Sequence, residues 1–165
     1  MTDADATSLD ADRGLTRALE LAYRHLSRRD RTEAQVRRHL AGRGVQEPAI
    51  DGAVRVISEQ GYLDDARYAR VFAEDRRSLD GWGSERIERA LLAAGVEDAL
   101  VADALGDRDA GGELDAAVAL LRRRCRTAPA TDRERERALG LLVRKGYELE
   151  LAYDAVRAFE RAAMG

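Results

Sequence analysis

The sequence lacks the residues that cross-link a chain or favour a β-sheet. Cys125 is the only cysteine, so no internal disulfide can form. There are two prolines, and aromatic residues make up 5% of the chain against 36% for charged residues, a profile that favours helices. Thirty of the 165 residues are alanine, and Leu, Ile, Val and Phe together number only 35, so the core must come from close helix packing. The composition predicts an all-α protein.

Few residues could carry catalysis or hold a metal. His25 and His39 lie fourteen residues apart, and two histidines with one cysteine cannot supply a four-ligand zinc shell. Cys125 has arginine neighbours and no nearby base in the sequence, which favours a packing role over a reactive thiol. The Gly-Trp-Gly at residues 81–83 follows no predicted strand and lacks the Walker pattern, so we interpret it as a helix break. We therefore predict a protein that is not an enzyme and has no catalytic residue, cofactor or metal.

The sequence also lacks the features that direct a chain to a membrane. No stretch approaches eighteen apolar residues, the length that a spanning helix needs. The acidic start of the chain has neither the basic nor the apolar region of a secretory signal. We expect a cytoplasmic protein without membrane association.

The most informative positive feature is an internal repeat of 51 residues without gaps. Gly44, Gly95 and Gly146 coincide when the sequence is shifted by this period. A leucine stands four positions before each glycine, and an apolar residue or tyrosine follows it. Glycine is favoured just after a helix because it readily adopts the left-handed conformation. The shared pattern predicts a helix, a glycine stop and a second helix.

Capping signals and amphipathic stripes extend this pattern to three helices in each repeat. Thr32 with Gln35 and Thr131 with Glu134 fit the capping box, in which two side chains bond the first backbone N–H groups of a helix. Ser84 fits an N-cap, and Pro48 suits a first helical position. A further apolar stripe precedes each helix pair. These stripes are Leu15, Ala18, Leu19, Ala22 and Leu26; Tyr68, Ala69, Phe72 and Ala73; and Leu114, Ala117, Val118 and Leu121.

We predict an all-α fold of three tandem three-helix repeats, stacked into an elongated body that can curve. The expected repeats cover residues 15–61, 62–107 and 108–165. Residues 1–14 are acidic and lack periodicity, so we predict a disordered tail there. Because no heptad seam continues across the repeats, we expect a monomer.

Basic residues are concentrated at two places along the chain, although the net charge is only −3. Residues 15–45 hold eight basic and three acidic residues and residues 118–145 hold nine and three, whereas residues 46–117 hold eight and seventeen. Solvated helix faces with local salt bridges would explain such a pattern, and so would contacts with a polyanion or an acidic protein. The candidate contact residues are Arg28, Arg29, Arg31, Arg37, Arg38, Arg122, Arg123, Arg124 and Arg126.

A helix-glycine-helix unit also invites comparison with the helix-turn-helix, whose second helix enters the major groove of DNA. Here the second helix of each repeat is rich in acidic residues, for example Glu47, Asp51 and Glu59 in the first repeat. Carboxylates would repel phosphates and oppose the counterion release that normally dominates affinity for DNA. Trp82 could stack on a base, but a packing role between repeats is the stronger interpretation. A nucleic-acid-binding module therefore remains the alternative function.

Four stretches of the sequence resemble the RecX family of bacterial regulatory proteins. They are RRDRTE at residues 28–33 leading to RGV at 43–45, GYLDDARYA at 61–69, GWGSERI at 81–87, and LVRKGY at 142–147. The likeness covers residues 15–161, and the ordered set is more specific than any one stretch. The second repeat departs from the family pattern, because Trp82 and Ala94 replace basic residues and Gly106 shortens the following helix.

The resemblance implies a regulator of homologous recombination and DNA repair. Members of the family bind the RecA recombinase filament on single-stranded DNA, inhibit its ATP hydrolysis and strand exchange, and reduce cleavage of the LexA repressor in the SOS response. This function needs no cofactor. The alternative is a helix-turn-helix-like nucleic-acid-binding module without specificity for RecA, and weak direct contact with DNA is compatible with both.

Overall fold

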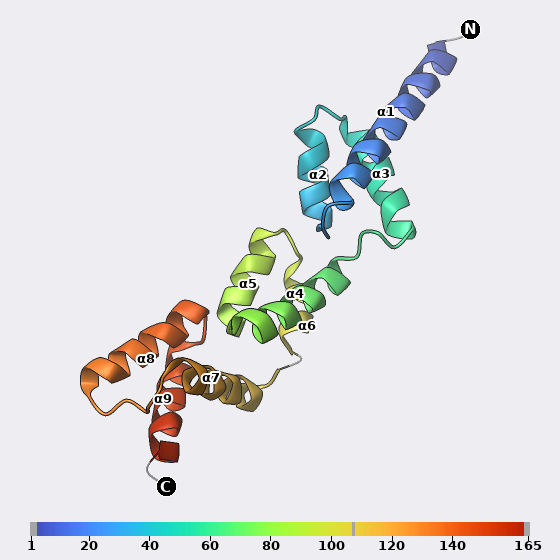
Figure 1. Ribbon diagram of the computed structural model, residues 1–165. Helices are drawn as coiled ribbons and strands as arrows, with labels where there is room; N and C mark the ends of the chain where they lie inside the picture. The colour runs from blue at the N-terminus through green and yellow to red at the C-terminus, as the bar shows by residue number, and fades with distance from the viewer. Residues whose placement is uncertain (1–2, 107, 164–165) are drawn as a thin grey trace. The chain divides into compact units, whose positions relative to one another are not determined.

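A computed structural model describes residues 3–106 and 108–163 (Figure 1). These described residues form nine α-helices and no strands, which confirms the all-α prediction. None of the helices is both long and apolar enough to cross a membrane. The helices are α1 (Asp3–Leu26), α2 (Glu33–Ala41), α3 (Glu47–Glu59), α4 (Asp65–Asp80), α5 (Ser84–Ala93), α6 (Asp98–Gly106), α7 (Ala110–Arg124), α8 (Asp132–Lys145) and α9 (Leu149–Ala163).

The described chain divides into two compact units. The first contains the chain up to Tyr68 together with the short segment Ala94–Glu97. The second contains Ala69–Ala93 together with the chain from Asp98 onward. Most of the second repeat thus groups with the third, while the turn that ends α5 groups with the first.

The helix starts follow the capping signals of the sequence, with one exception. Thr32 and Thr131 both form the predicted capping boxes, at the starts of α2 and α8. Pro48 lies in the first turn of α3, as expected. Ser84, however, is the first residue of α5 and not its N-cap. The residue before that helix is Gly83, whose backbone lies against the turn at Gly146.

The repeated glycines all adopt the left-handed conformation that the pattern predicts. Their φ angles are 75° at Gly44, 83° at Gly95 and 88° at Gly146. At Gly146 the next residue closes the turn, because the Tyr147 N–H donates to the Leu142 carbonyl at 3.1 Å. The Tyr147 side chain is thereby returned to the helix that it follows, where it is buried.

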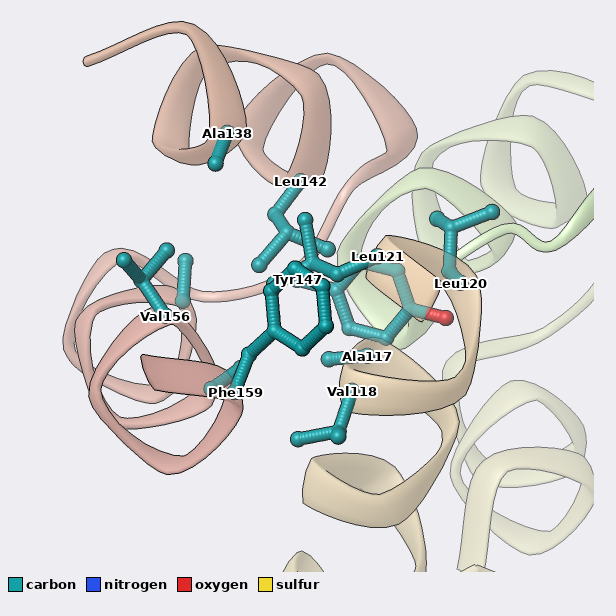
Figure 2. Close-up of a cluster of buried hydrophobic side chains, with 11 residues drawn as sticks. Ala117, Val118, Leu120, Leu121, Ala138, Leu142, Tyr147, Val156 and Phe159 are labelled. Atoms are coloured by element: carbon teal, nitrogen blue, oxygen red, sulfur yellow. The ribbon is translucent and has the colours of Figure 1, made fainter. Parts of the chain in front are cut away.

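Each unit has its own apolar core. In the first unit, Ala18 and Ala22 of α1 pack with residues of α2 and α3, and the predicted α1 stripe is buried or half-buried throughout. In the second unit, α7, α8 and α9 surround Tyr147 with apolar side chains (Figure 2). Small alanines on α7 and α9 let the helices approach closely, which gives density to a core with few large side chains.

The structure differs from the predicted disordered tail at residues 1–14. Met1 and Thr2 lie outside the described residues, but α1 already begins at Asp3 and runs on to Leu26. Side chains from Leu9 to Arg13 are exposed, so this part of α1 extends a helix whose later turns are anchored in the core. A helix that is already nucleated adds residues at little cost, which the lack of apolar periodicity did not reveal.

Candidate functional site: repeat joints and arginine surfaces

The first repeat meets the turn after α5 through the start of α2. The Thr32 hydroxyl donates to the Ala94 carbonyl at 2.5 Å, and Thr32 is fully buried. The Glu33 N–H donates to the Asp65 carboxylate at 2.9 Å. A Cβ atom at Gly95 would overlap that of Ala34. Burial raises the pKa of Asp65, although its bond to the Glu33 N–H acts in the opposite direction.

The second joint lies in the second unit and resembles the first, with the helix start and the glycine turn shifted by 51 residues. Here the Gly83 N–H donates to the Lys145 carbonyl at 2.8 Å, and the Glu85 N–H donates to the Gly146 carbonyl at 3.1 Å. The Ser84 N–H donates to the buried carboxylate of Glu113 at 2.7 Å. In each joint, therefore, the start of one helix docks on the glycine turn of the next repeat, and a carboxylate from the first helix of that repeat caps it.

Among the described residues, no other repeat meets the corresponding turn at Gly44 in this way. A Cβ atom at Gly44 would have no other atom within 4 Å. The Arg43 carbonyl, which corresponds to those of Ala94 and Lys145, accepts from the Arg17 guanidinium of α1 at 3.2 Å. Arg17 thus provides the hydrogen bond that Thr32 and Gly83 supply at the other two turns.

The predicted arginines of the first repeat fall into two groups. Arg28, Arg29 and Arg38 are exposed, and Arg31 is half-buried. Arg37 instead contacts three carboxylates: Arg37 Nε lies 2.9 Å from Glu33 Oε1, while Arg37 Nη1 lies 2.7 Å from Asp51 Oδ1 and 3.4 Å from Glu47 Oε1. Its hydrogen bonds to Asp51 and Glu33 raise the pKa of Arg37. Arg37 therefore connects α2 to α3 through partly exposed ion pairs, in addition to the apolar core that the two helices share.

His25 and His39 stack beside these arginines, which the sequence did not reveal. Their rings are nearly parallel, with centroids 3.9 Å apart and an angle of 6°. Burial lowers the pKa of both histidines, and the positive charges of Arg31 and Arg28 lower both further. The stack therefore favours two neutral imidazoles. The stack packs α1 against α2.

The other predicted arginines gather at the end of α7. Arg122, Arg123 and Arg124 occupy its last turn, where positive charge complements the helix dipole. They and Arg126 are all exposed. Cys125 ends the helix between them and is half-buried against the core, in keeping with a packing role. The structure thus keeps these four side chains on one short stretch of the surface of the second unit.

Trp82 lies in a cluster of aromatic rings and guanidinium groups within the second unit. The Arg86 guanidinium lies 4.1 Å from the centroid of the Trp82 ring, and that of Arg76 lies 5.6 Å from it. Phe72 meets Trp82 edge-on, with ring centroids 6.2 Å apart. Because Arg86 also donates to the Arg144 carbonyl at 3.0 Å, the cluster connects α5 to the end of α8. These contacts support the packing interpretation of Trp82.

A groove lined by three arginines, which we call the α4–α6 groove, lies in the second unit and is not evident from the sequence. It is open, has a volume of about 680 Å³ and is lined by Arg70, Val71, Glu74, Arg77, Ser78, Ala104 and Arg108. Its three arginines come from a stretch of chain in which acidic residues predominate, so summing charge along the sequence concealed them. The helical spacing of Arg70 and Arg77, seven residues apart, could have indicated one shared face.

The fold and its surfaces define a helical repeat protein whose exposed features are arginine clusters and an open groove. Family models identify the repeats: residues 18–55 match "RecX, first three-helix domain", and residues 64–105 match "RecX, second three-helix domain". The chain belongs to the RecX family of regulatory proteins.

Curated relatives and solved structures agree with this family. The chain is 33% identical over 139 residues to the "Regulatory protein RecX" of Mycobacterium sp. (strain JLS), covering 81% of this chain and 76% of the relative. It is 31% identical over 144 residues to that of Mycobacterium avium (strain 104), with coverages of 86% and 83%. The crystal structure of RecX from Lactobacillus salivarius has the same fold, with a TM-score of 0.78, 17% identity, and coverage of 91% of this chain and 99% of that one.

Proposed function

We propose that this protein binds the RecA filament on single-stranded DNA and inhibits its ATPase, strand exchange and LexA-cleavage activities, thereby modulating recombinational repair and the SOS response. Family membership is the observation that carries this proposal. We propose further that it acts as a cytoplasmic monomer built from repeats at residues 15–61, 62–107 and 108–165, of which residues 107, 164 and 165 lie outside the described residues.

The exposed arginines are the proposed contact residues. Arg28, Arg29 and Arg38 in the first unit and the cluster at the end of α7 present guanidinium groups that can pair with phosphates or carboxylates. Arg37 belongs to the predicted set but is less suited to this role, because three carboxylates already surround it. We expect its contribution to be mainly structural. The cluster at the end of α7 consists of Arg122, Arg123, Arg124 and Arg126, and the half-buried Arg31 completes the proposed set.

The test is to add the protein at a substoichiometric ratio to RecA, single-stranded DNA and ATP, and to follow ATP hydrolysis and strand exchange. We expect inhibition by the native chain and at least tenfold weaker inhibition by the triple variant Arg28→Glu, Arg29→Glu, Arg38→Glu. The matched control reverses three other exposed arginines, Arg55, Arg89 and Arg161, and should inhibit like the native chain.

A gel shift on free DNA separates this proposal from the alternative nucleic-acid-binding module. The alternative requires affinity for duplex DNA that falls steeply with salt. The acidic residues Glu47 and Asp51 on α3, already paired with Arg37, argue against such binding. Tight duplex binding without inhibition of RecA would select the alternative and refute the proposed function.

A further inference from the structure

The stacked imidazoles of His25 and His39 lie within a group of arginines that we call the α1–α2 cluster. Burial lowers the pKa of both histidines most, and the positive charges of the cluster lower it further. Every charged group with a main effect on either imidazole is positive, and none belongs to α3, the other helix packed against α1 and α2. The cluster consists of Arg28, Arg29, Arg31 and Arg43.

The positive charges of the α1–α2 cluster are not used within the fold. Three of its arginines are exposed and Arg31 is half-buried, with a buried Nε atom that has no hydrogen-bond partner. Among the described residues, no carboxylate forms an ion pair with any of the four side chains, whereas three carboxylates surround the nearby Arg37. Asp30 is the only acidic residue in the turn between α1 and α2. The cluster therefore presents an excess of positive charge to the solvent.

The surface of the α1–α2 cluster favours phosphates over an acidic protein segment. A protein segment gains most of its affinity from apolar or aromatic side chains buried at the centre of the interface. None of the large apolar side chains that the described structure exposes lies in residues 24–44. Binding to a nucleic-acid backbone needs no such apolar surface, because arginines pair with phosphate oxygens and release counterions.

A phosphate at the α1–α2 cluster would reverse the balance of charge at the two imidazoles. In the free protein the arginines favour neutral rings, but the negative charge of a docked phosphate raises the pKa of His25 and His39. A protonated imidazole also gains a second N–H donor, which a phosphate oxygen can accept. Since two positive rings with centroids 3.9 Å apart repel each other, we expect the pair to take up about one proton.

We propose that the α1–α2 cluster binds phosphates of single-stranded DNA, and that the His25–His39 stack takes up a proton from the solvent as they bind. Binding through this surface is therefore tighter at pH 6 than at pH 7.5. The inference rests on the proposed function, because the DNA strand of the recombinase filament then supplies the phosphates. It assigns these four arginines to the DNA and not to the recombinase.

Binding to labelled oligo(dT), followed by fluorescence anisotropy at pH 7.5 and pH 6 and constant ionic strength, tests the proton uptake. Thymine does not titrate in this range, and His25 and His39 are the only histidines of the chain. We expect the native chain to bind about three to ten times more tightly at pH 6. The double variant His25→Gln, His39→Gln should change by less than twofold, with circular dichroism to confirm that it is folded.

NMR titration of the native chain gives a second readout that needs no substitution. Addition of oligo(dT) should raise the pKa of at least one of the two imidazoles, since the docked phosphates favour the protonated form. Unchanged pKa values in the presence of bound oligo(dT) would overturn the proposal.

Neutral substitutions locate the binding surface. The double variant Arg28→Gln, Arg43→Gln should weaken binding of oligo(dT) at least fivefold at both pH values, and its affinity should depend less steeply on salt because two phosphate contacts are lost. The matched control Arg89→Gln, Arg161→Gln removes two other exposed arginines and should stay within twofold of the native chain. Equal affinities of the two double variants would contradict the proposed surface.

The remaining outcomes separate this inference from the proposed function. Tighter binding of poly-L-glutamate than of oligo(dT) would assign the cluster to an acidic protein and overturn the inference. Inhibition of RecA by a chain whose affinity for oligo(dT) is the same at pH 6 and pH 7.5 would refute the inference and leave the proposed function intact. Proton-linked binding of oligo(dT) by a chain that does not inhibit RecA would refute the proposed function alone.

Discussion

The three repeated glycines offer a direct measure of how much the joints contribute to stability. Replacing any of them with alanine places a Cβ atom on a residue with positive φ, which costs about 1–2 kcal/mol. At Gly44 this is the whole effect, because the added Cβ would have no atom within 4 Å. At Gly95 and Gly146 the Cβ would also overlap the partner helix of the joint, and overpacking typically adds about 1–3 kcal/mol.

We therefore expect a graded loss of unfolding free energy: about 1–2 kcal/mol for Gly44→Ala, and about 2–5 kcal/mol for Gly95→Ala and for Gly146→Ala. Gly146→Ala should be the most costly, because its Cβ would lie 2.6 Å from the backbone nitrogen of Arg86, which cannot move as a side chain can. Urea denaturation followed by circular dichroism and by the fluorescence of Trp82, the only tryptophan, measures these losses.

A double-mutant cycle isolates the steric part of the effect at the first joint. At Gly95 the nearest obstacle is the Cβ of Ala34, and the next atom of that residue lies 3.8 Å away. Adding Ala34→Gly should therefore recover about 1–2 kcal/mol of the loss caused by Gly95→Ala, beyond the sum of the single effects. Equal losses at all three glycines, or a coupling energy near zero, would show that the turns do not form joints.

Three further predictions concern the charged and titratable groups of the first unit. Because burial raises the pKa of Asp65, its ionised form is disfavoured in the fold, so its contribution to stability improves as the pH falls through this raised pKa. Asp65→Asn should abolish that improvement in urea unfolding measured from pH 7 to 4, whereas Asp65→Ala should cost about 1 kcal/mol by removing the acceptor for Glu33 N–H. Because the pKa values of His25 and His39 lie below 6.5, the contribution of the pair to stability is complete above that pH and is lost as the pH falls through the lowered values. His39→Gln should reduce this loss, and NMR titration of both imidazoles should give pKa values below 6.5; normal values would refute the reasoning. Arg37→Gln should lower the unfolding free energy by up to about 1 kcal/mol, since its side chain is 33% exposed and water screens its ion pairs. This variant should still inhibit the recombinase, and a loss of inhibition without a loss of stability would make Arg37 a contact residue.

Local signals in the sequence predict the helices well because each depends on a few neighbouring residues. Thr32 and Thr131 mark helix starts through bonds that span three residues, and Gly146 marks a helix end through its own φ angle. The tandem repeat is also predictable, because the same local signals recur with a period of 51 residues. Ser84 is the first residue of α5 and not the predicted N-cap, because the long-range contact of Gly83 with the turn at Gly146 determines where this helix begins.

The surfaces are less predictable because they depend on residues that are distant in sequence. His25 and His39 meet only when α1 packs on α2, and Arg37 finds Asp51 only across two helices. The α4–α6 groove requires Arg108 to return to the face of α4 that carries Arg70. A count of charges along the chain does not predict these arrangements, because burial and ion pairing determine which charges face the solvent.

Each repeat joint uses main-chain groups of a glycine turn and few side chains, since carbonyls of the turn accept hydrogen bonds, the glycine permits the close approach, and Thr32, Asp65 and Glu113 supply the side-chain hydrogen bonds. Such a connection constrains few side chains. Residues on the outer faces of a repeat can therefore change in evolution while the joint to the neighbouring repeat is kept. A chain lengthened by one whole 51-residue period should accordingly fold with an additional joint of the same kind, which would make repeat number a natural variable for engineering the reach of this protein.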